Sequence, residues 1–107
     1  MKCPYNELDL KLAMIGMPEL TTELETKFGN IKLEFPQTQA EINKAVAEHN
    51  GITLEMLINS PNMGAMITTY REILLLKLID QLKSELGLTD KQAWALVVAG
   101  TGLPIME

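Results

Sequence analysis

The sequence predicts an all-α fold, a small bundle of five or six helices with one long helix over about residues 61–86. Three observations indicate this class. Apolar residues recur at three- and four-residue spacing along most of the chain, which is the period of a helix packed on one side. All five prolines and nearly all seven glycines lie between these periodic runs, where helices begin and end. At several of the starts, Thr stands three residues before Glu or Gln, which is the spacing of a capping box.

Length and composition are those of one globular domain. We expect residues 1–107 to form it, with 100–107 as a flexible or partner-docked tail. Apolar residues make up 47% of the chain and charged residues 21%, which is neither a disordered nor a low-complexity composition. Fourteen acidic residues against nine Lys and Arg give a net charge of −5, and the basic residues are scattered. Because a phosphate backbone requires concentrated Lys and Arg, nucleic acid is a disfavoured partner.

The first predicted helix covers residues 6–15, with Asn6 able to cap its first turn. Its apolar residues share one face: Leu8, Leu12 and Ile15. A second helix is predicted to begin either at Pro18 or at Thr22, where a capping box starts. Gly29 is expected to end it in the left-handed conformation.

Residues 31–35 are the best strand candidate in the chain, because they alternate strictly between apolar and polar and stop at Pro36. Residues 51–56 repeat the same order of residue classes, so the two segments could pair as a small ribbon. The alternative is that 31–35 form an extended connector between helices. A lone strand would leave half of its backbone groups without partners.

Residues 38–59 have the outline of a helix-turn-helix. Thr38 and Glu41 form the clearest capping box, and Asn50-Gly51 is expected to end the helix that they begin. A second short helix is predicted within 53–59. That helix is apolar and acidic, whereas a recognition helix presents Arg, Lys, Asn or Gln to DNA bases. A helical hairpin packed into the core is therefore the favoured interpretation.

The long helix is predicted between Ser60-Pro61 and Gly87, since Ser can cap a first turn, Pro fits the first helical position and Gly suits the end. One stripe of it is apolar: Leu75, Leu78, Ile79, Leu82 and Leu86. Residues 73–76 are four consecutive apolar residues that point in four directions, so the middle of this helix must be covered on more than one side. A last helix is predicted over 90–99, begun by the capping-box spacing of Thr89 and Gln92.

The residues that carry most enzyme chemistry are scarce. Cys3 and His49 are the single cysteine and the single histidine, so a zinc or iron centre would lack ligands and nucleophilic catalysis would lack its usual partners. We therefore predict no catalytic, metal-binding or cofactor-binding residue and no enzyme activity. The longest charge-free run, residues 92–106, is shorter than the roughly 20 residues of a membrane span, and we expect a soluble, cytoplasmic protein.

More apolar surface is predicted than a domain of this size can bury, which favours a protein partner, either a second copy or another protein. The predicted interface residues lie in the long helix, the last helix and the tail: Ile73, Leu74, Leu76, Trp94, Val97, Val98, Leu103 and Ile105. The sequence thus favours a non-enzymatic helical interaction protein, such as a homo-oligomer, adaptor, assembly chaperone or inhibitor. The alternatives are a helix-turn-helix DNA-binding regulator and a small ligand-binding or enzymatic domain.

Overall fold

A computed structural model describes residues 3–15 and 22–100, and these residues form six α-helices and no strand. The helices are α1 (Glu7–Ile15), α2 (Thr22–Leu33), α3 (Gln39–His49), α4 (Leu54–Ile58), α5 (Met63–Leu86) and α6 (Asp90–Gly100). The predicted all-α bundle with one long helix is therefore confirmed. The predicted interface residues Leu103 and Ile105 lie outside the described residues, as does Pro18.

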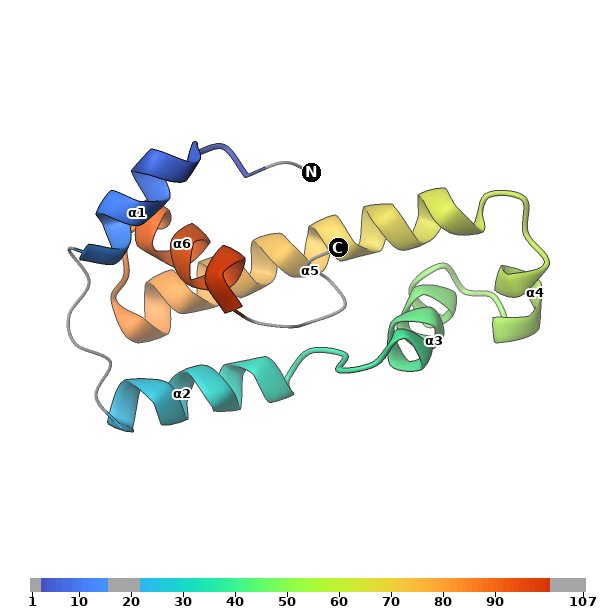
Figure 1. The fold of residues 1–107 in the computed structure, drawn as a ribbon. Helices are drawn as coiled ribbons and strands as arrows, with labels where there is room; N and C mark the ends of the chain where they lie inside the picture. Colours follow the sequence, from blue (N-terminus) through green and yellow to red (C-terminus); the bar gives the residue numbers. More distant parts are fainter. Residues whose placement is uncertain (1–2, 16–21, 101–107) are drawn as a thin grey trace.

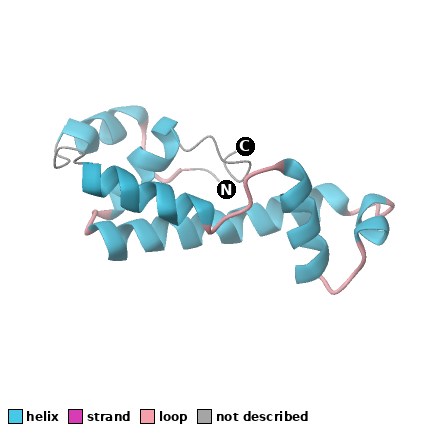
Figure 2. Ribbon diagram, turned by 90° about the horizontal axis from the view of Figure 1, so that it is seen from below, coloured by secondary structure: helices cyan, strands magenta, loops and turns pink. Residues whose placement is uncertain are grey.

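The long helix α5 runs through almost the whole length of the molecule, and the other helices pack on it or on one another (Figure 1). On one side α2 lies along the C-terminal half of α5 and α3 contacts the N-terminal half, as the view from below also shows (Figure 2). On the other side α6 folds back along α5 and carries α1. The result is an elongated bundle whose Cα atoms extend over 46 × 28 × 19 Å.

One hydrophobic cluster follows α5 from end to end. The α5 side chains in it are those of the predicted stripe and its extension toward the N-terminus: Ile67, Leu74, Leu75, Leu78, Ile79 and Leu82. Ile31 and Phe35 reach this cluster from the α2 side, and Trp94 and Val97 reach it from α6. Covering α5 on two sides buries only some of the four apolar residues 73–76. Leu74 and Leu75 are buried, whereas Leu76 is exposed.

The strand predicted at residues 31–35 is wrong, as are its pairing with 51–56 and the alternative of an extended connector over 31–35. Residues 31–33 are the last turn of α2, and Glu34 and Phe35 continue it as turns, donating to the carbonyls of Ile31 and Lys32 at 3.1 Å. In a strand, Ile31, Leu33 and Phe35 would share a face. Here Ile31 and Phe35, four residues apart, are buried together, while Leu33 is 73% exposed. Ile31 and Phe35 fit the two-residue period of a strand and also the four-residue spacing of a helix face. Their burial in the core is compatible only with the helix, because Leu33 is left outside.

Gly29 is consequently an interior residue of α2 and does not end it, because its φ is not positive. The end of α2 is held instead by Gln37, whose side-chain amide donates to the Lys32 carbonyl and, at 2.7 Å, to the Phe35 carbonyl. These bonds satisfy acceptors that a helix end leaves open. Gln37 N also donates to Glu41 Oε2 at 2.8 Å, which links the end of α2 to the start of α3.

Three of the other predicted caps are found where the sequence placed them. Asn6 Oδ1 accepts from Asp9 N at 2.8 Å, Thr38 Oγ1 accepts from Glu41 N at 3.1 Å, and Thr89 and Gln92 bond each other reciprocally. Gly87 ends α5 with φ 67°. The start of α5 is two residues later than predicted, since Ser60 Oγ accepts from Asn62 N at 3.2 Å and residues 60–62 form a turn.

Candidate functional site

The predicted interface residues fall into two groups in the described structure. Three of them are buried within the chain and belong to its own core: Leu74, Trp94 and Val97. Ile73 is half-buried, and Leu76 and Val98 are 47% and 51% exposed. Of the predicted residues that the structure describes, the second group therefore offers accessible surface and the first group belongs to the core.

A hollow between α5 and α6 brings three of these predicted residues together. Ile73 and Leu76 enter it from α5 and Trp94 enters it from α6. It has a volume of about 510 Å³, and we refer to it as the α5–α6 hollow. The remaining lining residues are Lys77, Ile79, Asp80, Lys83 and Asp90. The hollow therefore has an apolar centre and a rim with charges of both signs, as small-molecule and protein-docking sites commonly have.

Asp90 makes two polar contacts at the rim of the α5–α6 hollow. Its Oδ1 lies 3.4 Å from Lys83 Nζ on α5, and its Oδ2 accepts a 2.6 Å hydrogen bond from the Tyr5 hydroxyl. That bond raises the pKa of Tyr5 above its ordinary value of 10.0, and desolvation and the nearby negative charges, chiefly that of Asp90, act in the same direction. Lys91 Nζ lies 5.6 Å from the centre of the Tyr5 ring. The segment before α1 is thus attached beside the hollow.

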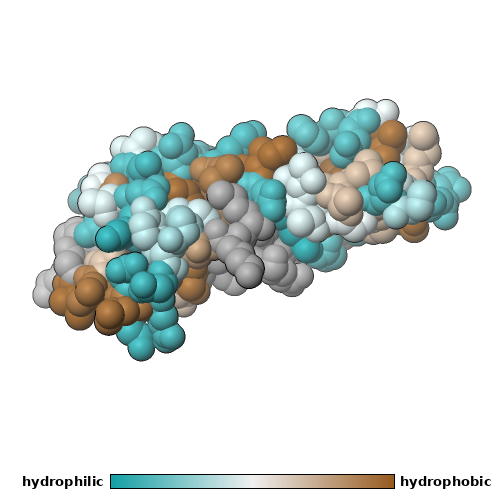
Figure 3. Space-filling view, turned by 90° about the horizontal axis from the view of Figure 1, so that it is seen from above, coloured by the Kyte–Doolittle hydropathy of each residue, from teal (hydrophilic) through white to brown (hydrophobic). Residues whose placement is uncertain are grey.

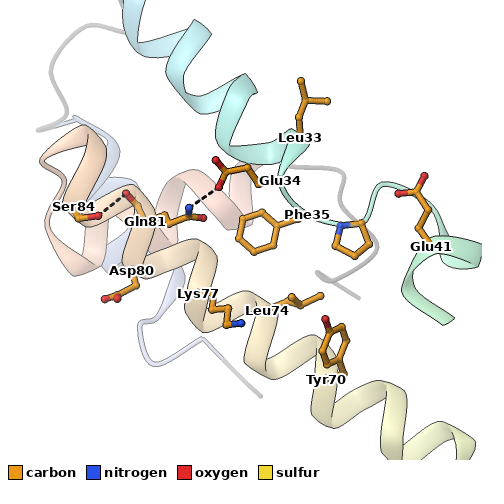
Figure 4. Close-up of a pocket in the computed structure, with 11 residues that line it drawn as sticks. Leu33, Glu34, Phe35, Glu41, Tyr70, Leu74, Lys77, Asp80, Gln81 and Ser84 are labelled. Carbon is orange, nitrogen blue, oxygen red and sulfur yellow. Dashed lines mark hydrogen bonds between the residues drawn. The ribbon is translucent and has the colours of Figure 1, made fainter. Parts of the chain in front are cut away.

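A larger groove lies on the neighbouring face of α5, beside the turn that follows α2 (Figure 4). We refer to it as the α2–α5 groove, and its volume is about 800 Å³. The residues that line it are Leu33, Glu34, Phe35, Pro36, Glu41, Tyr70, Leu74, Lys77, Asp80, Gln81 and Ser84. Figure 4 shows Phe35 pointing toward α5, with Leu74 and Tyr70 farther along that helix. Lys77 and Asp80 line both this groove and the α5–α6 hollow, so they form the ridge between the two.

Gln81 contributes an unusual polar group to the α2–α5 groove. Its Nε2 donates to Glu34 Oε2 at 2.7 Å (Figure 4), which joins α5 to the turn after α2. Its Oε1 is buried and has no hydrogen-bond partner within the described residues. Burying an unpaired acceptor costs about 1–3 kcal/mol, so this oxygen is a local cost to stability at the base of the groove.

The outer face of α1 is a third apolar surface. Leu8, Leu12 and Ile15 follow one another along it and all three are exposed, and α1 has no fully buried residue. Figure 3 shows hydrophobic residues gathered at the end of the molecule that carries α1. Their spacing of four and three residues predicts a shared face, which is the sequence signal for such a surface. The spacing does not indicate whether that face is buried or exposed, so no interface was predicted there.

Potential metal ligands are not clustered in the part of the chain that the structure describes. Within residues 3–15 and 22–100, no group of three or more His, Cys, Asp or Glu residues could hold a metal ion. The His49 ring packs against the Tyr70 ring, with centroids 5.0 Å apart. Over the same residues, no helix combines the length and the apolar character that crossing a membrane requires.

The helix-turn-helix outline is present as the pair α3 and α4, joined by a turn that contains Gly51 at φ 67°. The second helix has only five residues, Leu54–Ile58, and its one charged side chain is Glu55. Three of its apolar side chains are exposed: Leu54, Met56 and Ile58. No feature of this pair favours the DNA-binding alternative over a helical hairpin.

No protein-family model, curated protein or solved structure matches this chain. Its function has to be inferred from its own surfaces.

Proposed function

We propose that this chain is a non-enzymatic helical interaction protein that binds a protein partner through the α5–α6 hollow, first of all a second copy of itself. The observation that carries the proposal is the meeting of Ile73, Leu76 and Trp94 from two helices around one apolar hollow. All three are among the interface residues that the sequence predicts. A cytoplasmic setting belongs to the same proposal, since the single Cys3 offers no intramolecular disulfide to an oxidising compartment.

The energetics support a partner at this place. Fully burying a leucine side chain contributes about 1.5–3 kcal/mol, and Leu76 is 47% exposed, so covering it would contribute roughly 1 kcal/mol. Val98, one helical turn after Trp94 on α6, adds further exposed apolar area. Trp94 cannot be the point of contact because the core already buries it. It supports the wall of the hollow from within the core, and Leu76 and Ile73 offer the surface that a partner would contact.

The experiment measures mass in solution by light scattering after size exclusion over a wide concentration range. The wild-type mass should rise above the 11.9 kDa of one chain as concentration increases. Leu76→Ser should weaken this association about five- to tenfold, which corresponds to the roughly 1 kcal/mol above. The matched control is Leu54→Ser on α4, since Leu54 is 44% exposed and Leu76 47%, and it should leave the mass unchanged.

A wild-type chain that stays monomeric at every concentration would exclude self-association. A photo-crosslinking residue at position 76, compared with one at position 54 in the cells that produce the protein, would then test for a different protein partner. Equal crosslinking at the two positions would refute the α5–α6 hollow as an interface.

A further inference from the structure

The α2–α5 groove points to a second, separate interaction. We propose that it binds a basic amphipathic helix of a partner protein, whose apolar residues pack on Leu33, Phe35 and Tyr70 and whose Arg and Lys residues face Glu34 and Glu41. This inference does not depend on the proposed function, because the two surfaces lie on neighbouring faces of α5 and share only the ridge residues Lys77 and Asp80.

The shape of the groove suits a helix. Of the six α5 residues that line it, five follow alternating spacings of four and three, which places them on one face: Tyr70, Leu74, Lys77, Gln81 and Ser84. From the first to the last of them α5 rises roughly 21 Å, or about four turns. A partner helix of similar length can lie along this face with its own residues at three- and four-residue spacing, as in other helix-in-groove complexes.

Apolar contact is available at the rim as well as on the floor. Phe35 and Leu74 are buried and form the floor, and Tyr70 is half-buried. Leu33 stands at the rim with 73% of its surface exposed, because the turn after α2 sends Ile31 and Phe35 into the core instead. An occupant that covered Leu33 would bury a side chain that the chain itself cannot bury.

The polar groups of the groove are mainly acceptors and carboxylates, so they are complementary to hydrogen-bond donors that carry positive charge. Glu34, Glu41 and Asp80 supply three carboxylates against the single ammonium of Lys77. Glu34 and Glu41 each accept one bond, from Gln81 Nε2 and Gln37 N, and an ionised carboxylate has room for several more.

Arg and Lys side chains are the donors that match these acceptors. They combine several N–H groups with a positive charge, and hydrogen bonds between ionised groups are stronger than neutral ones. The net charge of −5 over the whole chain would also steer a basic segment toward this protein. Nucleic acid and anionic lipid carry the wrong charge for three carboxylates, so a protein segment is the occupant.

The test uses a fluorescent, amidated 15-residue helical peptide with Leu at three- and four-residue spacing and Arg on both flanks of the Leu stripe. Binding to the full chain is followed by fluorescence anisotropy at low and at physiological ionic strength. A second peptide has Glu in place of every Arg. The Arg peptide should bind, more weakly as salt increases, and the Glu peptide should not.

Paired variants show whether binding occurs at the groove. Glu34→Gln combined with Glu41→Gln keeps both side-chain acceptors but removes two charges, and it should weaken binding about three- to tenfold. The control, Glu7→Gln with Glu55→Gln, makes the same change in net charge at the two ends of the molecule and should leave binding within about twofold.

Leu33→Ser should also weaken binding, whereas Leu8→Ser, at a position of similar exposure (65%), should not. Leu76→Ser should leave it unchanged.

Three results would overturn the proposal. Equal losses in the two double-Gln variants would mean that the peptide responds only to total charge. Unchanged binding by Leu33→Ser would mean that the groove is not the site. Full displacement of the peptide by an equal concentration of arginine amide would mean that the site takes a small cation and does not require a helix.

Discussion

The Tyr5 hydroxyl donates a 2.6 Å hydrogen bond to Asp90 Oδ2, and the two residues are 85 positions apart in the sequence. The other oxygen of the same carboxylate lies 3.4 Å from Lys83 Nζ. One side chain therefore joins the segment before α1, the last turn of α5 and the first turn of α6. The carboxylate also stands at the N-terminus of α6, where the helix dipole favours a negative charge.

Tyr5→Phe should lower the urea midpoint of unfolding at neutral pH, because it removes this hydrogen bond and leaves the packing of the ring in place. The raised pKa of Tyr5 sets the pH dependence of the effect. A folded-state pKa above the unfolded value of 10.0 means that the stabilisation is fully present below about pH 10 and is lost as pH rises through the folded pKa. The difference in midpoint between wild type and Tyr5→Phe should therefore shrink at high pH. A difference that stays constant across that range would contradict the linkage.

Substitution by alanine should change the free energy of unfolding in opposite directions at Gly29 and at Gly87. Gly29 lies inside α2 at a φ that is not positive and no atom lies within 4 Å of an added Cβ, so Gly29→Ala should stabilise the fold by about 0.5–1 kcal/mol. Gly87 has φ 67°, so Gly87→Ala should destabilise it by about 1–2 kcal/mol. Denaturant unfolding measures both. Destabilisation by Gly29→Ala would support the helix end at Gly29 that the sequence predicts.

Leu78 and Leu76 are two residues apart on α5 and should differ strongly in their contribution to stability. Leu78 is fully buried, and Leu78→Ala should lower the free energy of unfolding by about 2–5 kcal/mol. Leu76 is exposed, and Leu76→Ala should change it by less than about 1 kcal/mol in dilute, monomeric protein. Thermal and urea unfolding followed by circular dichroism give both values. A large loss from Leu76→Ala would mean that α5 is covered on the hollow side as well.

Thr89→Ala should remove one half of the reciprocal cap at the start of α6. Thr89 Oγ1 accepts from Gln92 N at 3.2 Å, and Gln92 Oε1 accepts from Thr89 N at 3.0 Å. Loss of an N-cap side chain costs about 1 kcal/mol. Thr68→Ala, at an exposed position inside α5, is the control and should not destabilise, because Ala has the higher helix propensity. Equal unfolding free energies for the two variants would show that the cap does not hold α6.

Several helix ends could be predicted from the sequence, because the capping residue and the backbone group that it bonds are close neighbours in the chain. Thr38 with Glu41, Thr89 with Gln92, and Gly87 each act within one turn, so their roles could be predicted without tertiary contacts. Residues 31–35 could not be assigned in this way, because Ile31 and Phe35 fit both a two-residue and a four-residue period. The choice between them depends on the cluster along α5, which lies more than 30 residues away in the sequence.

The two candidate sites also differ in how far the sequence could predict them. Ile73, Leu76 and Trp94 could be selected from the sequence because each belongs to a run that is apolar on all sides. Which of them is exposed could not be predicted, since that depends on where α6 folds against α5. The α2–α5 groove was missed altogether. Glu34, Glu41 and Gln81 are ordinary polar residues of three different segments, and no local pattern distinguishes them.

The sequence by itself determined that this protein is helical, where most of its helices begin and end, and which stripe of α5 is buried. These properties follow from interactions within one or two helical turns and from the helical period. The tertiary structure alone decided that residues 31–33 belong to a helix, that Trp94 is a core residue, and that Tyr5 meets Asp90. The physical reason is that burial and long-range hydrogen bonds depend on how whole helices pack, and residues distant in the sequence make those contacts.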